Sequence, residues 1–150
     1  MILVIGIGNP DRGDDAAGLA VAKRIQAATL PGEVTVRELV GDQLALLDEW
    51  MGAADVFVVD AVSSGGTPGT VYRFDAADAL TERFRHRGTH MFSLAGVIEL
   101  ARALDRLPRH LAGFGIEGAD FAIGAGLSPR AAAAVDEVTS LLLADIKAGV

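Results

Sequence analysis

The sequence contains no cysteine, which excludes disulfides, thiolate metal sites and a cysteine nucleophile. It also lacks any uncharged apolar run long enough to span a membrane, and no basic segment of the kind that opens a signal peptide precedes its first apolar residues. We therefore expect a cytoplasmic protein. There is no internal repeat and no linker rich in serine or proline, and 150 residues is a usual length for one domain. We expect a single domain over residues 1–150.

Basic residues are few. The chain has 13 lysines and arginines against 20 aspartates and glutamates, a net charge of −7. This balance argues against a nucleic-acid backbone or an anionic membrane as the main partner, because both would be repelled. Hydrophobic residues make up 51% of the chain, which is typical of a folded protein rather than a disordered one.

The order of apolar patterns predicts an α/β fold. Strands are expected at residues 2–7, 34–39, 55–60, 70–74 and 111–116. Helices are expected at 15–28, 44–51 and 92–104, with a last one that Ser128 caps and Pro129 begins. Residues 75–89 are charged and fit a loop with a short helix. Strands that alternate with helices predict a mostly parallel five-stranded sheet covered on both faces, and the strand at 70–74, which follows a short turn, is expected to be an antiparallel edge.

Polar side chains gather where the predicted strands end, which is where sites form in such sheets. The residues at these ends are Asn9, Asp11, Arg12, Asp14, Asp15, Asp60, His90 and Glu117. His86 and His110 are expected to be surface residues. The H-E-x-x-H and G-x-S-x-G motifs are both absent, so neither a zincin nor a serine hydrolase is supported.

The loop after the first strand, residues 6–15, superficially resembles a dinucleotide-binding turn. Its glycine spacing does not fit G-x-G-x-x-G. Asp14 and Asp15 would also lie at the helix N-terminus, where they would repel a pyrophosphate. Nucleotide binding is therefore disfavoured, and it would be detected as thermal stabilisation by NAD or a nucleotide.

Two carboxylates and one imidazole at the strand ends suit a divalent ion such as zinc or nickel. Each residue also has a structural interpretation. One aspartate of the Asp14–Asp15 pair can cap the following helix, although that role needs only one of them. Asp60 can bond to its own turn, and a lone loop histidine such as His90 is commonly a surface residue.

The sequence resembles the hydrogenase maturation endopeptidases, which remove the C-terminal extension of the large-subunit precursor of nickel-iron hydrogenases. The similarity lies in Gly6-Ile7-Gly8-Asn9-Pro10, Arg12-Gly13-Asp14-Asp15, Gly18, Val58-Val59-Asp60-Ala61, His90 with Leu94 and the helix to Leu100, Gly115-Ile116-Glu117, and Gly126-Leu127-Ser128-Pro129. These motifs occur in the family's order and span most of the chain. The resemblance implies an α/β/α sandwich and an endopeptidase.

The resemblance also implies functional residues. The family's three metal-contacting positions correspond to Asp15, Asp60 and His90, and the metal would be nickel carried by the hydrogenase large-subunit precursor, although other divalent ions can fit such a site. We expect these residues to act at the scissile bond, with Asp14 as the first candidate to accept a proton. A monomer is the favoured oligomeric state.

The sequence departs from the family at three positions. Ala16 stands where glycine is expected after the acidic pair, and Asp11 replaces a usually apolar residue. The family commonly has Asp-Gly-Gly after the second strand, where this chain has Val40-Gly41-Asp42, so Asp42 is a candidate replacement for that aspartate. The alternative function is a non-catalytic, metal-dependent binding or chaperone module for a hydrogenase-like partner, which would bind the partner without shortening it.

Overall fold

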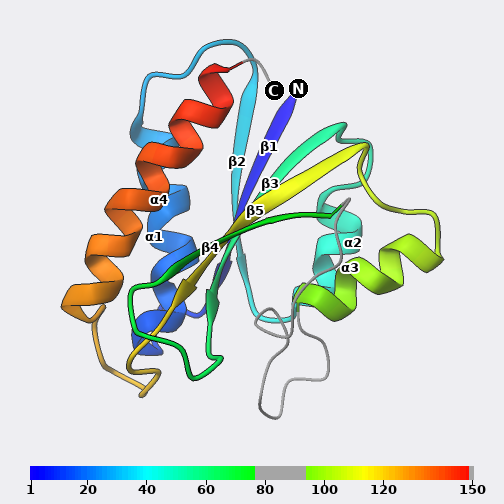
Figure 1. Ribbon diagram of the computed structural model, residues 1–150. Helices are drawn as coiled ribbons and strands as arrows, with labels where there is room; N and C mark the ends of the chain where they lie inside the picture. Colours follow the sequence, from blue (N-terminus) through cyan, green and yellow to red (C-terminus); the bar gives the residue numbers. More distant parts are fainter. Residues whose placement is uncertain (77–93, 149–150) are drawn as a thin grey trace.

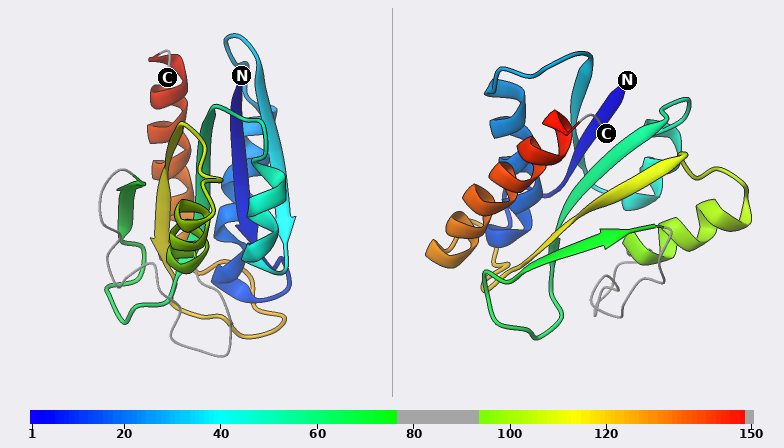
Figure 2. Two further views of the ribbon diagram at one scale, coloured as in Figure 1. Left: turned by 90° about the vertical axis from the view of Figure 1, so that its right-hand side faces the viewer. Right: turned by 45° about the horizontal axis from the view of Figure 1, so that its top comes forward.

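The computed structural model describes residues 1–76 and 94–148. Five strands form one sheet in the order β2-β1-β3-β5-β4. Their bounds are Ile2–Gly8 for β1, Val34–Val40 for β2, Asp55–Val62 for β3, Val71–Asp75 for β4 and His110–Glu117 for β5. The order can be followed in the left view of Figure 2, which looks onto the face of the sheet.

Helices cover both faces of this sheet (Figure 1). α1 (Ala17–Ala27) and α4 (Pro129–Lys147) lie on one face, and α2 (Leu46–Glu49) and α3 (Leu94–Ala103) lie on the other. Two 3-10 turns, η1 (Gly13–Ala16) and η2 (Gln43–Ala45), lead into α1 and α2. The predicted α/β/α sandwich is therefore confirmed. None of the helices in the described part of the chain is long and apolar enough to cross a membrane.

Alternate residues of the central strands fill two separate cores. In β3, Val56 and Val58 pack toward α2 and α3, whereas Phe57 and Val59 pack toward α1 and α4. A strand with apolar residues on both faces appears in the sequence as a continuous hydrophobic run, because successive side chains point to opposite sides of the sheet. This is why the buried strands could be recognised from the sequence.

The strand directions bring the expected functional loops to one edge. β1 pairs in parallel with β2 and β3, and β3 pairs in parallel with β5. β4 pairs with β5 in the antiparallel direction, so the predicted antiparallel edge strand is confirmed. The carboxyl ends of β1, β3 and β5 consequently share the edge of the sheet where a site was predicted.

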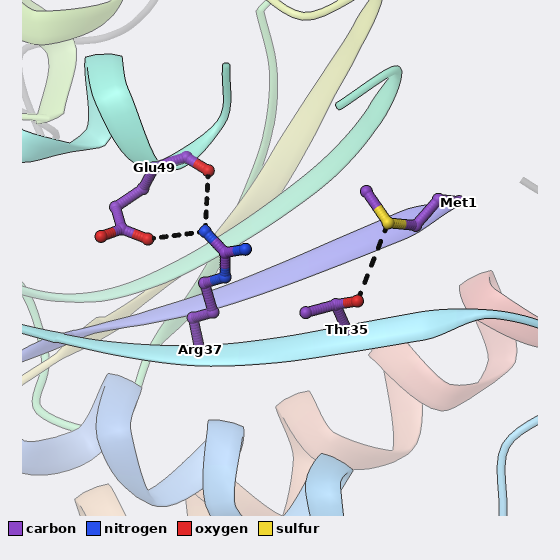
Figure 3. Close-up of polar contacts among 4 residues, drawn as sticks. All are labelled: Met1, Thr35, Arg37 and Glu49. Atoms are coloured by element: carbon purple, nitrogen blue, oxygen red, sulfur yellow. Dashed lines mark hydrogen bonds and ion pairs between the residues drawn. The ribbon is translucent and has the colours of Figure 1, made fainter. Parts of the chain in front are cut away.

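The opposite edge strand, β2, is tied to its surroundings by polar contacts that Figure 3 shows. Arg37 donates to the Glu49 carboxylate over 3.0 Å and to the Glu49 carbonyl over 3.3 Å, which links β2 to the end of α2. The Thr35 hydroxyl donates to the sulfur of Met1 at 3.8 Å. Charged side chains on an edge strand also oppose pairing with another chain.

Two predicted helices begin differently in the structure. The helix expected at 15–28 starts as the 3-10 turn η1, and regular α-helix begins only at Ala17. The helix expected at 44–51 is likewise a 3-10 turn followed by the short α2. The beginning of the helix expected at 92–104 and most of the loop expected at 75–89 lie outside the described residues.

Candidate functional site

The loop between β1 and α1 carries the first predicted site residue, Asp15. A glycine allows the helix that follows this loop to pack directly on the sheet. A Cβ on Gly18 would lie 2.4 Å from the carbonyl oxygens of both Ile7 and Val59, which is too close for any other residue. The start of α1 thus lies against β1 and β3, and the half-buried Asp15 lies at the edge where both strands end.

Asp60 lies near the end of β3, and its side chain is only 3% exposed. Burial raises the pKa of this carboxyl well above its ordinary value of 3.8, and the negative charge of Asp15 raises it further. Hydrogen bonds from the Ala61 backbone and the Gln43 side chain lower the pKa, but they do not offset the first two effects. The structure therefore brings Asp15 and Asp60 close enough for their charges to interact.

The third predicted ligand, His90, lies outside the described residues. Within residues 1–76 and 94–148, no group of three histidines, aspartates or glutamates is placed to hold a metal ion. The three-residue site therefore stays a prediction.

Asp14 occupies a different environment from its neighbour. Its side chain is fully buried, and its carboxylate accepts hydrogen bonds from the backbone of Ala119 (2.7 Å), Asp120 (3.2 Å) and Ser128 (2.7 Å) and from the Ser128 hydroxyl (2.8 Å). Burial acts to raise the pKa of Asp14, but these bonds outweigh it and the pKa is lowered. Asp14 as a proton acceptor stays a prediction, but the contacts favour a structural role.

Ser128 connects this network to α4. Its hydroxyl accepts from the Ala131 N–H at 3.3 Å, so the predicted cap of the last helix is confirmed. The same residue donates to Asp14 from its backbone and from its hydroxyl. One carboxylate thus fastens the β1–α1 loop to the segment between β5 and α4.

Glu117, at the end of β5, is 1% exposed and also has a structural role. Its carboxylate accepts from the Ser64 backbone at 3.0 Å, from the Ser64 hydroxyl and from the Tyr72 hydroxyl at 2.9 Å. These bonds hold the connection between β3 and β4 against the end of β5.

The sequence interpretation missed Gln43. The side chain of Gln43 is 8% exposed, and its amide nitrogen donates to Asp60 Oδ2 at 2.6 Å. Asp42, the residue considered from the sequence, instead caps η2 by accepting from the Leu44 N–H at 2.9 Å. A buried glutamine is uncommon, but nothing in the local sequence indicates that this one is buried.

Comparison with known proteins gives one consistent result. A family model described as hydrogenase maturation protease, HycI, matches residues 19–145. A protein of Methanocaldococcus jannaschii, provisionally named a hydrogenase maturation protease, is 28% identical over 97% of this chain and 96% of its own length.

Solved structures agree with these sequence matches. The hydrogenase maturating endopeptidase HybD of Escherichia coli has a TM-score of 0.80 at 24% identity, covering 97% of this chain and 91% of that one. An endopeptidase of Escherichia coli solved in solution has a TM-score of 0.81 at 26% identity, covering 99% of this chain and 94% of that one. The first similarity is one of fold, and the second extends to the sequence.

Proposed function

Since the chain belongs to the hydrogenase maturation protease family, we propose that it removes the C-terminal extension of a nickel-loaded hydrogenase large-subunit precursor. In this proposal Asp15, Asp60 and His90 contact the nickel that the substrate carries, and the scissile peptide bond lies beside them. The nickel is part of the substrate. The chain itself supplies the carboxylates and the imidazole that recognise it.

The observation that supports this proposal is the electrostatic coupling of Asp15 and Asp60. The charge of Asp15 raises the pKa of Asp60, which means that the two carboxylates repel each other when both are ionised, and Asp60 is buried. A divalent cation between such groups would replace this repulsion with attraction. Carboxylate oxygens and an imidazole are also donors that nickel accepts, so the proposed residues fit the ion chemically.

Asp15 and Asp60 would each have a defined task in this proposal. A divalent ion beside a peptide bond polarises its carbonyl or lowers the pKa of a bound water. Asp60 would offer a carboxylate held in place by the core, and Asp15 would offer a second, more accessible one. Because the raised pKa of Asp60 favours its protonated form, binding of the precursor's metal is expected to be accompanied by release of that proton.

The test is cleavage of a purified precursor, with and without nickel, followed by intact mass. Wild-type protein is expected to shorten the nickel-loaded precursor and to leave the nickel-free one intact. Asp15→Asn, Asp60→Asn and His90→Ala are each expected to lower the cleavage rate by at least about a hundredfold, since the stabilisation supplied through a metal amounts to several kcal/mol.

Matched controls are available at the other end of the sheet, where the parallel strands begin. Asp105→Asn and His110→Ala make the same chemical changes at exposed residues, one between α3 and β5 and the other at the start of β5. Both should cleave like the wild type. Full activity of the three site variants would refute the proposed site. A stable complex with an uncleaved precursor would instead support the binding-module alternative.

A further inference from the structure

A short hydrogen bond joins two buried side chains from different elements at the proposed site. Gln43 Nε2 donates to Asp60 Oδ2 at 2.6 Å, and the exposed fractions of the two residues are 8% and 3%. Gln43 lies in η2 on one side of the sheet, and Asp60 lies in β3 within it. The contact therefore connects the β2–α2 loop to the central strand.

The backbone around Gln43 is fixed on both sides. Asp42 caps η2 through its carboxylate, and the Ala45 N–H donates to the Asp42 carbonyl at 3.2 Å. Immediately after η2, Leu46 and Leu47, the first two residues of α2, are buried in the core. The Gln43 amide is thus presented to Asp60 from an anchored backbone, so it can restrict the orientation of the carboxylate.

The chemical nature of the donor matters as much as its position. An amide N–H has no net charge and does not titrate at ordinary pH. A lysine or arginine in its place would neutralise Asp60 and weaken its attraction for a cation. Glutamine can hold the carboxylate without neutralising it, and carboxylates that bind metals are commonly held by hydrogen bonds of this kind.

We propose that Gln43 is a positioning residue of the catalytic site, which orients the Asp60 carboxylate toward the metal of the substrate. In this role Gln43 acts through the carboxylate of Asp60. The proposal rests on the proposed function for the role of Asp60, but the hydrogen bond on which it depends can be tested separately.

The first test is spectroscopic and needs no activity. The sequence has only two glutamines and one asparagine, so three side-chain amides are visible by ¹⁵N NMR and Gln43→Met identifies the signals of Gln43. We expect these signals to differ from those of the exposed Gln26, to exchange slowly with solvent and to move toward them in Asp60→Ala. Gln43 signals that match Gln26 and do not respond to Asp60→Ala would overturn the proposal.

The second test separates positioning from simple stability. Gln43→Met keeps the length of the side chain and removes the donor, and Gln26→Met makes the same change on the exposed surface of α1. Loss of a group that orients a metal ligand typically costs 10- to 100-fold in affinity or activity. We expect Gln43→Met to lower both kcat/KM on the nickel-loaded precursor and the affinity of the free protein for NiCl2 by about that factor, and Gln26→Met to change neither.

The outcomes distinguish the two proposals. If Asp60→Asn is inactive while folded Gln43→Met retains wild-type kcat/KM and nickel affinity, the positioning role is refuted and the proposed function stands. If Asp60→Asn is itself fully active, the proposed function fails, and the positioning role toward the substrate's metal fails with it. If Gln43→Met loses stability but keeps wild-type nickel affinity, the role of Gln43 is only structural, and this result also refutes the inference.

Discussion

The carboxylate of Asp14 accepts hydrogen bonds from residues between 105 and 114 positions later in the chain. Three backbone amides and one hydroxyl converge on it, so the charged form is favoured in the folded protein and its pKa is lowered. A group with a lowered pKa and four donors is a poor proton acceptor. It is well suited to hold two segments of the chain together.

This arrangement predicts that Asp14→Asn destabilises the protein. Hydrogen bonds to a charged group contribute about 1.5–3 kcal/mol each, and asparagine retains one acceptor oxygen, so the free energy of unfolding should fall by at least about 2 kcal/mol at pH 7. Because the folded pKa is lowered, this stabilisation is present above the ordinary value of 3.8 and is lost as pH falls through the folded pKa. Urea unfolding of the variant and the wild type across this range measures the difference.

The control is Asp11→Asn, an exposed carboxylate in the same loop. Its free energy of unfolding should lie within about 0.5 kcal/mol of the wild type, as for most surface changes. An Asp14→Asn protein as stable as this control at pH 7 would show that the network contributes little.

For Asp60, the dependence of stability on pH is expected to have the opposite sign. Its raised pKa means that the protonated form is favoured on folding, so this group's stabilisation is complete below 3.8 and is lost as pH rises through the folded pKa. Asp60→Asn, measured in EDTA to remove metal ions, should therefore be more stable than the wild type at neutral pH, by a margin that shrinks in acid. A variant that is less stable at neutral pH would contradict the assigned shift. Stability gained where activity is lost is the usual trade-off at a functional site.

At the scale of elements, α1 can lie against the sheet, with Asp15 in the turn η1 just before it, only because Gly18 has no side chain. A Cβ there would lie 2.4 Å from two backbone oxygens, those of Ile7 and Val59, and neither strand can move without disturbing the core. Alanine would favour helix by about 1 kcal/mol over glycine, but overpacking against rigid backbone costs about 1–3 kcal/mol or more. Gly18→Ala should therefore be destabilising.

The measurement is urea unfolding at neutral pH, with a net loss of at least about 1 kcal/mol expected for Gly18→Ala, since the clash involves two backbone oxygens. Gly126→Ala is the matched control, because a Cβ at Gly126 meets no atom within 4 Å. Equal stabilities of the two variants would indicate that α1 is free to shift away from the sheet.

The elements and their order were predictable from the sequence because they depend on local patterns. The apolar run before Asp60 identifies a buried strand, and parallel strands place its end beside the end of β1. The contact between Gln43 and Asp60 was not predictable, because it depends on how η2 approaches β3 across 17 residues of chain. The hydrogen bonds of Asp14 were not predictable for a similar reason, since their donors belong to a segment that follows the last strand.

At the scale of the whole molecule, the net charge of −7 attracts cations to every part of the surface, whereas the proposed site would bind one specifically. Asp60→Asn weakens this general attraction no more than Asp105→Asn does, because the raised pKa of Asp60 favours its neutral form. Only the first removes a proposed ligand.

Nickel that binds the folded state raises its stability, by about 2.7 kcal/mol at a concentration a hundred times its Kd. At constant ionic strength, NiCl2 should raise the Tm of the wild type and of Asp105→Asn alike, and that of Asp60→Asn much less. Equal shifts in all three proteins would mean that nickel responds only to the overall charge.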